Sequence, residues 1–289
     1  MRVTVLFTTY NSEAWLEKVF WGLVNQTHTN FEVIVADDGS NAATQALIER
    51  MQATTPLDIT HVWHPDNGFQ KCAILNKALL HVRTEYVIFT DGDCILRSDF
   101  VATHVQHARR GRYLSGSYYK LPMATSQAIT QDDVQHQRCF DVAWLHRHGL
   151  PRRRGTLKLR VGARSAALLN RITTTQCNLK GANASAWLDD ILAVNGFDER
   201  MQWGGLDREF GVRLINLGIT PTHVRYNAIC VHLDHARGYQ DPQMVQANKA
   251  LRIAVAKARI VQTPNGIAQL LASGYPAPES LALQKFKRC

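Results

Sequence analysis

Four short apolar runs within the first hundred residues constrain the fold of this chain more than any other feature. They span residues 3–10, 31–40, 57–64 and 86–93. The segments between them have the character of helices, at residues 12–26, 42–52 and, after a loop, 66–82. Continuous apolar runs are typical of strands that are covered on both faces. The alternation therefore predicts an α/β fold with a mostly parallel sheet and helices on both faces.

Three of these predicted strands end in clusters of polar residues. The clusters are residues 8–11 (Thr-Thr-Tyr-Asn), 37–40 (Asp-Asp-Gly-Ser) and 91–93 (Asp-Gly-Asp). A single Asp-Gly pair is more often an ordinary turn. In an open parallel sheet, however, ligands bind outside the carboxyl ends of the strands. Three polar strand ends directed at one crevice predict a binding site.

The spacing of Asp91 and Asp93 favours a divalent cation within this site. Mg²⁺ or Mn²⁺ binds one or two carboxylates and takes its other ligands from phosphate and water. Such a cation neutralises a diphosphate and makes it a better leaving group. The pair Asp37-Asp38 at a neighbouring strand end strengthens this interpretation over that of a simple turn.

The surplus of basic residues lies in one part of the chain. The formal net charge is +9, and residues 142–188 contain nine Lys or Arg and no Asp or Glu. A local basic region indicates a local acidic partner rather than a general affinity for nucleic acid. Since the sequence carries no known nucleic-acid-binding motif, we expect no nucleic-acid partner.

The sequence predicts a cytoplasmic protein. It has no apolar run of about 18 residues, the length that a membrane-spanning helix needs. Its first residues, MRVTVLFTTYN, lack the small-residue cleavage site of a signal peptide. Its six cysteines form no Cys-x-x-Cys pair, which argues against structural zinc and against a disulfide framework.

The order of the motifs resembles the family 2 glycosyltransferases with the GT-A fold. The matching stretches are TTYN, VADDGS, NGFQKCAILNKAL, YVIFTDGDC, GANASAW, VNGFDE and WGGLDREF. The resemblance implies an inverting enzyme that moves a sugar from a UDP-sugar to a saccharide or glycolipid acceptor. It also implies Mn²⁺ or Mg²⁺ as cofactor, and a role in lipopolysaccharide or other surface-polysaccharide biosynthesis.

The resemblance divides the chain into three parts. Residues 1–115 form a nucleotide-sugar-binding half. Residues 116–240, with the basic segment 142–188, form an acceptor-binding half with a galactosyltransferase-like acceptor region. Residues 241–289 form a helical tail. Within these parts, residues 113–122 and 227–235 are predicted as strands and residues 243–262 as a helix.

The resemblance also assigns roles to individual residues of the first half. Asp38 accepts a hydrogen bond from uracil, and Asn183, from the second half, lies beside the donor sugar. The full set expected around the nucleotide sugar is Thr9, Tyr10, Glu13, Asp38, Gln70, Lys71, Asp91 and Asn183. The metal ligands are expected to be Asp91 and Asp93 with His232, or with His235 in its place.

The catalytic base is expected from the stretch Trp203–Phe210. Inversion is a single displacement, so one carboxylate must take the proton of the acceptor hydroxyl. Asp207 falls on that position in the family pattern, whereas Leu206 replaces the usual Glu, which contacts the acceptor. The acceptor contacts are expected to be Trp203, Gly204, Gly205 and Glu209. The pair His104 and His107 lacks a carboxylate context and is predicted to lie on a helix surface.

Three explanations stay open for the most basic stretch, residues 151–164. It is a solvated surface loop, a segment that approaches anionic lipid headgroups, or a binding segment for a phosphorylated acceptor. Arg160, Arg164 and Arg171, set among apolar residues, suit a helix that lies on a membrane. We therefore expect residues 151–171 to offer a surface for an anionic membrane, with the protein peripheral at the inner membrane.

Two other functions were weighed against glycosyl transfer. A sugar-1-phosphate nucleotidyltransferase shares the sheet and the metal, but such enzymes open with a glycine-rich basic loop after the first strand. The stretch TTYNSEAW has neither glycine nor a basic residue. A degenerate, non-catalytic relative is disfavoured because Asp38, Asp91, Asp93 and Asp207 are all present.

Overall fold

The computed structural model describes residues 1–152, 155–235 and 241–288, so Arg153 and Arg154 of the basic stretch lie outside the described residues. The strands among these residues are β1 (Val3–Thr9), β2 (Phe31–Asp37), β3 (Asp58–Trp63), β4 (Tyr86–Asp91), β5 (Cys94–Leu96), β6 (Arg112–Ser115), β7 (Ser117–Lys120), β8 (Ala184–Trp187), β9 (Thr220–His223) and β10 (Ile229–His232).

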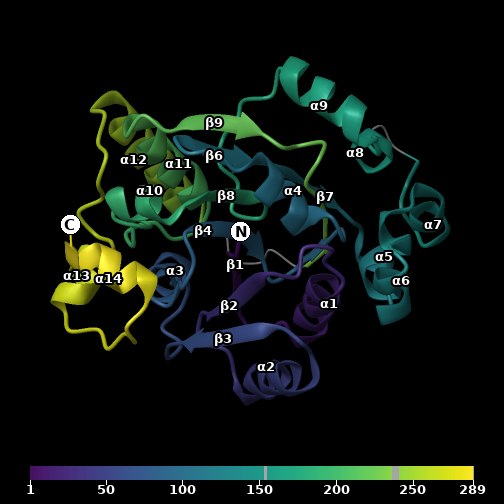
Figure 1. Cartoon of the computed structure of the whole chain (residues 1–289), viewed down its shortest axis with the longest axis horizontal. Helices are drawn as coiled ribbons and strands as arrows, with labels where there is room; N and C mark the ends of the chain where they lie inside the picture. Colours follow the sequence, from purple (N-terminus) through teal and green to yellow (C-terminus); the bar gives the residue numbers. More distant parts are fainter. Residues whose placement is uncertain (153–154, 236–240, 289) are drawn as a thin grey trace.

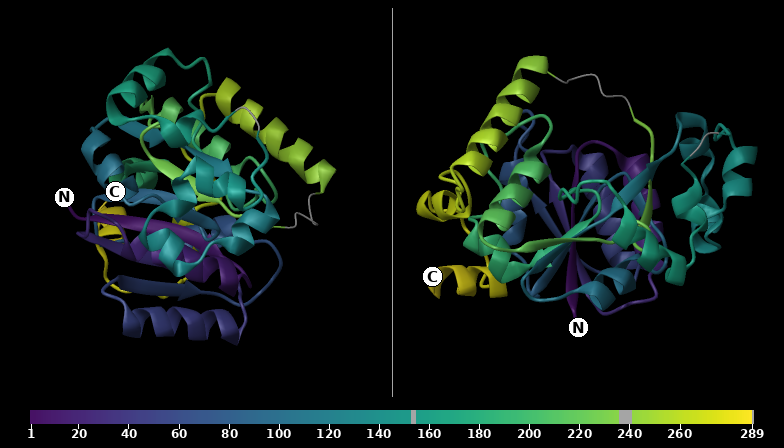
Figure 2. Two further views of the ribbon diagram at one scale, coloured as in Figure 1. Left: turned by 90° about the vertical axis from the view of Figure 1, so that its right-hand side faces the viewer. Right: turned by 90° about the horizontal axis from the view of Figure 1, so that it is seen from above.

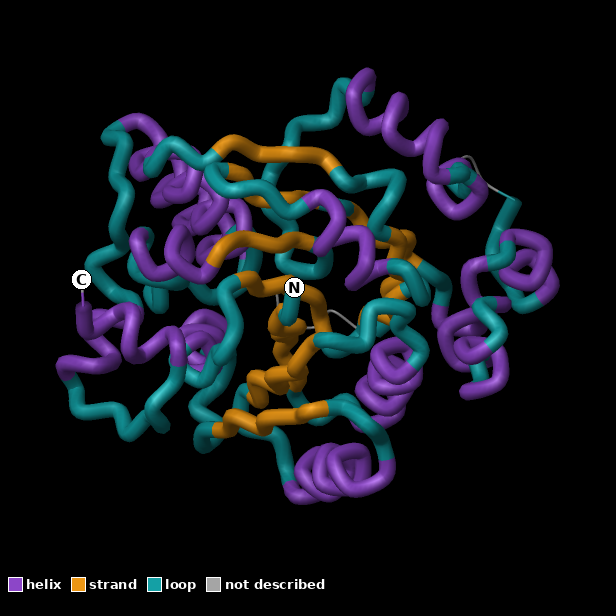
Figure 3. The backbone as a smooth tube through the Cα atoms, in the orientation of Figure 1, coloured by secondary structure: helices purple, strands orange, loops and turns teal. Residues whose placement is uncertain are grey.

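Helices flank the strands on both sides of the view and below them (Figure 3). Those of the first half are α1 (Glu13–Val24), α2 (Ala42–Thr54), α3 (Lys71–Leu79) and α4 (Phe100–His107). The remainder are α5 (Met123–Ala128), α6 (Gln131–Gln135), the 3₁₀ helix η1 (Arg138–Phe140), α7 (Val142–Arg147), α8 (Leu157–Arg160), α9 (Ala163–Ile172), α10 (Leu188–Ala193), α11 (Leu206–Asn216), α12 (Pro242–Lys257), α13 (Ile267–Ala272) and α14 (Leu281–Arg288).

Seven strands form the main sheet, in the order β3-β2-β1-β4-β8-β6-β9 (Figure 1). The first four are parallel, β8 is antiparallel to both of its neighbours, and β9 is parallel to β6. The predicted α/β class with a mostly parallel sheet is thus confirmed. Because β1, β2 and β4 end at the same edge, the polar residues that follow them lie close together.

Helices cover both faces of this sheet, which explains the continuous apolar runs. Val5 and Val33 pack in the cluster beneath α1, α2 and α4. Their neighbours Leu6 and Ile34 pack in the cluster beneath α3, α10 and α11. Successive side chains of a strand point to opposite faces, so a strand buried on both faces needs apolar residues at every position.

The strand predicted over residues 113–122 is two strands in different sheets. β6 belongs to the main sheet, whereas β7 joins a smaller sheet in the order β5-β10-β7. Gly116 lies between them, and a Cβ there would be 2.2 Å from Asn183 Oδ1. The side chain of Asn183 fills that space and donates to the carbonyl of Ser117 (3.0 Å). A glycine is therefore required at the point where the chain changes sheet.

The small sheet carries its own helical cover. Helices α5 to α7 pack on β5 and β10 through an apolar cluster that includes Ile95, Trp144 and Val231. Figure 2 (right) shows these helices on the opposite side of the molecule from α12. None of the helices in the described part of the chain has the length and apolar character that crossing a membrane requires.

The C-terminal residues pack on the first half. Ile267, Ala282 and Leu283 are buried in the same cluster as α3 and α10. Lys285 pairs with Asp189 at 2.7 Å. The main sheet also contains strands from both sides of the predicted boundary at residue 115, because β8 lies between β4 and β6. Residues 1–115 and 116–240 therefore both contribute strands to the main sheet, and residues 241–288 pack on the apolar cluster that contains α3 and α10.

His104 is buried, so its predicted position on a helix surface is wrong. Its Nδ1 lies 2.7 Å from Ser185 Oγ, and its Nε2 lies 3.1 Å from Asn183 Oδ1. An amide oxygen only accepts, so Nε2 carries the hydrogen and the Ser185 hydroxyl donates to Nδ1. Burial lowers the pKa of His104 to about 3, and the ring is therefore neutral.

Candidate active site

The turn Asp91-Gly92-Asp93 directs two carboxylates to different partners. The amide of Gly92 donates to the carbonyl of Thr8 (3.0 Å), and a Cβ at Gly92 would lie 2.6 Å from that oxygen. Only glycine lets the turn pack this closely against β1. Asp91 ends β4 and faces Lys71, whereas Asp93 leads into β5 and the small sheet.

A cleft of about 860 Å³ opens at this edge of the main sheet. It brings together residues from both predicted halves of the chain. The residues that line it are Thr8, Thr9, Tyr10, Asn11, Ser12, Trp15, Asp38, Gly68, Phe69, Lys71, Asp91, Gly92, Asp93, Trp203, His232 and His235. Most of the residues expected around the nucleotide and the metal are therefore neighbours here.

Two histidines face the carboxylate of Asp93. Their Nε2 atoms lie 3.4 Å (His232) and 3.2 Å (His235) from Asp93 Oδ2. Nδ1 of His232 lies 2.6 Å from the carbonyl of Leu233, which only accepts, so Nδ1 carries the hydrogen. In the neutral ring Nε2 is then an acceptor that faces another acceptor. Such an arrangement calls for a proton or a metal ion between the two atoms.

The donor atoms at this point suit a divalent cation. Ligand atoms of Asp93, Cys94 and His232 lie within 4.8 Å of one another. Burial raises the pKa of the Cys94 thiol, which therefore stays protonated and a poor ligand. Burial opposes ionisation of Asp93, but the two histidines outweigh it and hold its pKa below the usual value. A carboxylate beside imidazoles is a donor set that a divalent metal ion can bind.

Lys71 is the cation nearest to the acids of the cleft. Its Nζ donates to Asp91 Oδ1 at 2.7 Å. Burial alone would lower the pKa of Lys71, but the charge and hydrogen bond of Asp91, together with the charges of Asp93 and Asp207, outweigh it, and the pKa lies above its usual value. The side chain is therefore a permanent cation between the cleft and the core.

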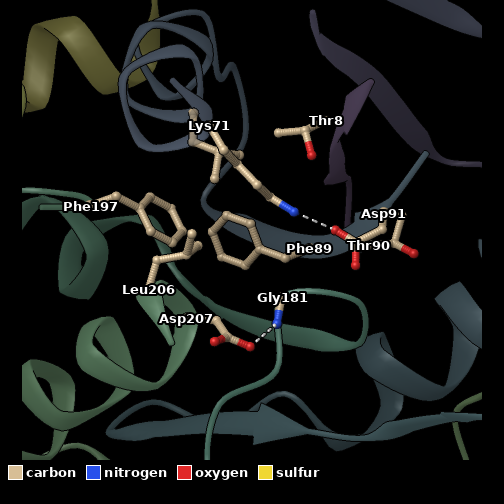
Figure 4. Close-up of a pocket in the computed structure, with 10 residues that line it drawn as sticks. Thr8, Lys71, Phe89, Thr90, Asp91, Gly181, Phe197, Leu206 and Asp207 are labelled. Atoms are coloured by element: carbon tan, nitrogen blue, oxygen red, sulfur yellow. Dashed lines mark hydrogen bonds and ion pairs between the residues drawn. The ribbon is translucent and has the colours of Figure 1, made fainter. Parts of the chain in front are cut away.

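Asp207, the expected base, lies across a small cavity from Lys71 and Asp91 (Figure 4). Both of these residues also line the larger cleft. The carboxylate of Asp207 accepts from the amides of Gly181 (3.1 Å) and Arg208 (2.8 Å), which fix its orientation. Burial raises the pKa of Asp207, which makes it a better proton acceptor than an exposed aspartate.

Asp38 is held rigidly at the far end of the cleft. Its Oδ1 accepts from Nε2 of His64 (2.8 Å), and its Oδ2 accepts from the amide of Gln70 (3.0 Å). The amide of Gln70, rather than its side chain, thus contacts the site. Nearby, the hydroxyl of Tyr10 donates to Asp66 (2.8 Å), and Tyr10 is half exposed. The ring of Tyr10 is consequently available to a flat ligand.

Gln70, Gly204 and Gly205 are not among the residues that line the cleft, and Glu13, Asn183 and Glu209 have their partners elsewhere. Glu13 accepts from the Thr44 hydroxyl (2.6 Å) and joins α1 to α2. Asn183 is buried between the two sheets, where its amide joins backbone carbonyls. Glu209 is buried and takes two hydrogen bonds from Arg213, at 2.7 and 2.9 Å. The polar side-chain atoms of Asn183 and Glu209 are thus all engaged by other groups of the protein.

The aromatic pair Phe69 and Trp203 lines the cleft, and only Trp203 is predicted from the sequence. The rings of Phe69 and Trp203 lie 3.9 Å apart with an interplanar angle of 31°. Gly204 and Gly205 have φ values of 79° and 84°, which glycine adopts without strain. Asn248 on α12 donates to the carbonyls of Trp203 and Gly204, both at 2.9 Å. Phe69 lies in the NGFQK stretch, in which only Gln70 and Lys71 are predicted to be site residues.

The sheet, the cleft at its C-terminal edge and the paired acids define the GT-A class of α/β proteins. Residues 4–171, more than half of the chain, match the sequence model of the glycosyl transferase family 2. The chain therefore belongs to the glycosyl transferase family 2, and the predicted family and fold are confirmed.

Curated relatives are larger proteins. A hyaluronan synthase of Pasteurella multocida is 27% identical over 224 residues, which are 75% of this chain and 23% of that protein. A chondroitin synthase of Escherichia coli is 25% identical over 75% of this chain and 32% of its own length. The uncharacterized glycosyltransferase YfnE of Bacillus subtilis is 35% identical over 37% of this chain and 26% of its own length. The chain thus spans about a quarter to a third of the length of these relatives.

Solved structures share the fold over nearly the whole chain. The mannosyltransferase PcManGT of Pyrobaculum calidifontis, in complex with GDP-Man and Mn²⁺, has a TM-score of 0.57 at 18% identity. It covers 99% of this chain and 79% of its own. S. aureus TarS 1-349 in complex with UDP-GlcNAc has a TM-score of 0.58 at 16% identity, over 99% and 72% of the two chains. At these identities the likeness speaks for the fold alone.

Proposed function

We propose that this glycosyltransferase moves a sugar from a UDP-sugar to a hydroxyl of a saccharide or glycolipid acceptor with inversion and with a divalent metal. One observation carries the proposal: Asp93 with its two histidines and Asp207 flank the same cavity system, joined by Lys71 and Asp91. We place the reaction in lipopolysaccharide or other surface-polysaccharide biosynthesis, in line with the polysaccharide synthases among the relatives.

Asp207 acts as the general base. Its carboxylate takes the proton of the acceptor hydroxyl as that oxygen bonds to the anomeric carbon and the bond to the diphosphate breaks. Two backbone amides hold this carboxylate, so it enters the reaction already oriented. Because attack comes from the face opposite the leaving group, the anomeric configuration inverts.

Asp93 and His232, with His235 beside them, hold the cation, and Asp91 adds a carboxylate at the same strand end. When bound, Mn²⁺ or Mg²⁺ neutralises the charge that develops on the departing diphosphate. Lys71 stays protonated, keeps Asp91 in place and adds a second positive charge. The rigid carboxylate of Asp38 accepts from the uracil ring, and the ring of Tyr10 lies over the base.

A nucleotidyltransferase is disfavoured by membership of the glycosyl transferase family 2. That alternative also has no role for Asp207, because nucleotidyl transfer needs no base on the acceptor side of the cleft. We therefore do not pursue it.

The outward face of α9 supports a position at an anionic membrane surface. Leu168 and Ile172 are 59% and 61% exposed, and Arg164 and Arg171 lie on the same face at helical spacing. Apolar side chains interleaved with arginines suit anionic headgroups. Sedimentation with vesicles of phosphatidylglycerol and phosphatidylcholine, against phosphatidylcholine alone, tests this. Equal recovery with both kinds of vesicle contradicts it.

The proposed reaction is tested by UDP release. Purified protein is incubated with Mn²⁺ and a panel of UDP-sugars, with EDTA and the variant Asp93→Asn as controls. We expect release with at least one donor, and a loss of about tenfold or more with EDTA or with Asp93→Asn. Release that EDTA leaves unchanged contradicts the metal, and a product with retained anomeric configuration contradicts inversion.

A further inference from the structure

Four basic side chains gather on the acceptor side of Asp207. They come from separate parts of the second half: Lys158 on α8, Lys180 before β8, Arg208 on α11 and Arg225 between β9 and β10. Lys180 is close enough to Arg225, Arg208 and Asp207 for each of them to shift its pKa. Lys158 is close enough to Arg225 and Lys180 to be affected in the same way.

The fold holds this basic cluster in place. Lys158 turns inward and donates to the carbonyl of Tyr118 on β7. Arg225 follows β9, which is fixed because the amide of Val224 donates to the carbonyl of Ser115 (3.0 Å). Lys180 precedes Gly181, whose amide holds Asp207. Lys180 and Arg208 are therefore tied to Asp207 through backbone amides, and Lys158 and Arg225 are positioned by β7 and β9.

Among the described residues, no acidic side chain forms an ion pair with this cluster, and Asp207 is the one acid that raises the pKa of Lys180. The ion pairs among residues 1–152, 155–235 and 241–288 include none to Lys158, Lys180, Arg208 or Arg225. The Nε of Arg225 is buried and lacks a hydrogen-bond partner within the same described residues. Partly buried like charges repel each other, and an unsatisfied buried donor is costly. An anion at this point removes both costs.

Burial and the neighbouring cations lower the pKa values of Lys158 and Lys180. The pKa of Lys158 is lowered to about 8, chiefly by burial and also by Arg225 and Lys180. The pKa of Lys180 is lowered as well, again by burial first and then by Arg225 and Arg208. An oxyanion bound beside both lysines would favour their charged forms.

We propose that the acceptor carries an oxyanion, a phosphate or a carboxylate, that binds between Lys180 and Arg225 while a nearby hydroxyl faces Asp207. This proposal rests on the proposed function and names the class of its acceptor. The guanidinium of Arg225 offers the planar pair of donors that suits phosphate and carboxylate groups. The amino group of Lys180 adds a point charge on the side of the base.

The test measures the affinity of the whole chain for three sugars by calorimetry, with UDP and Mn²⁺ present to fill the donor cleft. The sugars are glucose, glucose 6-phosphate and glucuronate, so that the two kinds of oxyanion are separated. We expect one charged sugar to bind about tenfold or more tightly than glucose. The variants Lys180→Gln and Arg225→Gln should each remove most of that preference while changing the affinity for UDP less than about twofold.

Matched variants separate charge from folding. Lys249→Gln, on the exposed side of α12, should leave the preference intact. Arg225→Lys should keep part of it, and Arg208→Gln gives an exposed alternative should Arg225→Gln fail to fold. If the protein binds UDP but has equal affinity for all three sugars, the proposal of an anionic acceptor is overturned and the proposed function is not. Failure of the wild-type chain to bind UDP with Mn²⁺ overturns the proposed function and this proposal together.

Discussion

Glu32, at one edge of the main sheet, differs in its partners from Asp93 and Asp207, near the opposite edge. At the edge where the parallel strands begin, Glu32 is buried and accepts from the Thr4 hydroxyl (2.7 Å) and from the Nε of Arg83 (2.8 Å). At the edge where they end, Asp93 faces two imidazoles, and Asp207 is held only by backbone amides.

The kind of partner distinguishes an acid that stabilises the fold, such as Glu32, from acids that are placed to bind a ligand, such as Asp93 and Asp207. Glu32 has a permanent cation beside it, so its charge is already offset within the protein. Asp207 and Asp93 lack a comparable arginine or lysine in direct contact among the described residues. A charge that the chain leaves unmatched beside a cleft is best explained by chemistry in that cleft.

The largest effect on activity is expected for Asp207→Asn, near the edge where the parallel strands end. The amide keeps the shape of the side chain but cannot take a proton, so kcat should fall about 10²- to 10⁴-fold. The Kd for UDP with Mn²⁺, measured by calorimetry, should stay within about threefold because Asp207 lies outside the nucleotide cleft. Turnover within a few fold of wild type would show that another group is the base.

A matched pair on the same helix sharpens the comparison. Arg213→Met leaves the buried carboxylate of Glu209 without its cation, and the free energy of unfolding should fall by about 3 to 5 kcal/mol. Urea denaturation measures this change. The double variant Arg213→Met with Glu209→Leu should recover part of the loss, because no buried charge is left unpaired. A double variant no more stable than the single one would assign the loss to packing instead.

The pH dependence of turnover is the next effect. Burial raises the pKa of Asp207, and the base must be deprotonated, so activity is present above that pKa and lost as the pH falls through it. The acid limb of kcat/KM should therefore lie above about 4, the usual range for aspartate, and fall about tenfold per pH unit. An acid limb at the usual aspartate value would contradict a buried base.

The smallest effect on activity and stability is expected for Asp58→Asn, at the edge where the parallel strands begin. Asp58 pairs with Arg83, and both side chains are nearly half exposed, so solvent screens the pair. The free energy of unfolding should change by less than about 1 kcal/mol. UDP release should stay within about twofold of wild type, which makes this variant the control for Asp207→Asn. A loss of activity comparable to that of Asp207→Asn would remove the distinction between the two edges.

The sequence was sufficient for the sheet and for much of the cleft, for a physical reason. Strand runs and the polar residues that follow them are local patterns, and parallel topology brings strand ends together without further information. Thr9, Asp38, Asp91 and Asp93 belong to this group. Their neighbourhood could be inferred before any distance was known.

The residues that sequence reasoning misplaced depend on long-range packing. Asp207 and Glu209 are two positions apart on α11, and side chains at that spacing point to different sides of a helix. Which of the two is buried depends on Arg213 and the carbonyls that it also contacts. In the same way, His104 is buried by a network with Ser185, about eighty positions away in the chain. No local pattern contains such a partner.

The hydrogen bonds from Asn248 to the carbonyls of Trp203 and Gly204 mean that α12 holds the Trp203 loop in position beside the cleft. Its own side chains line no part of that cleft. Trimming the chain at residue 241 would leave every cleft residue in place and remove the brace that sets the angle of the Trp203 ring. Asn248 thus fixes the backbone beside the Trp203 ring from outside the cleft.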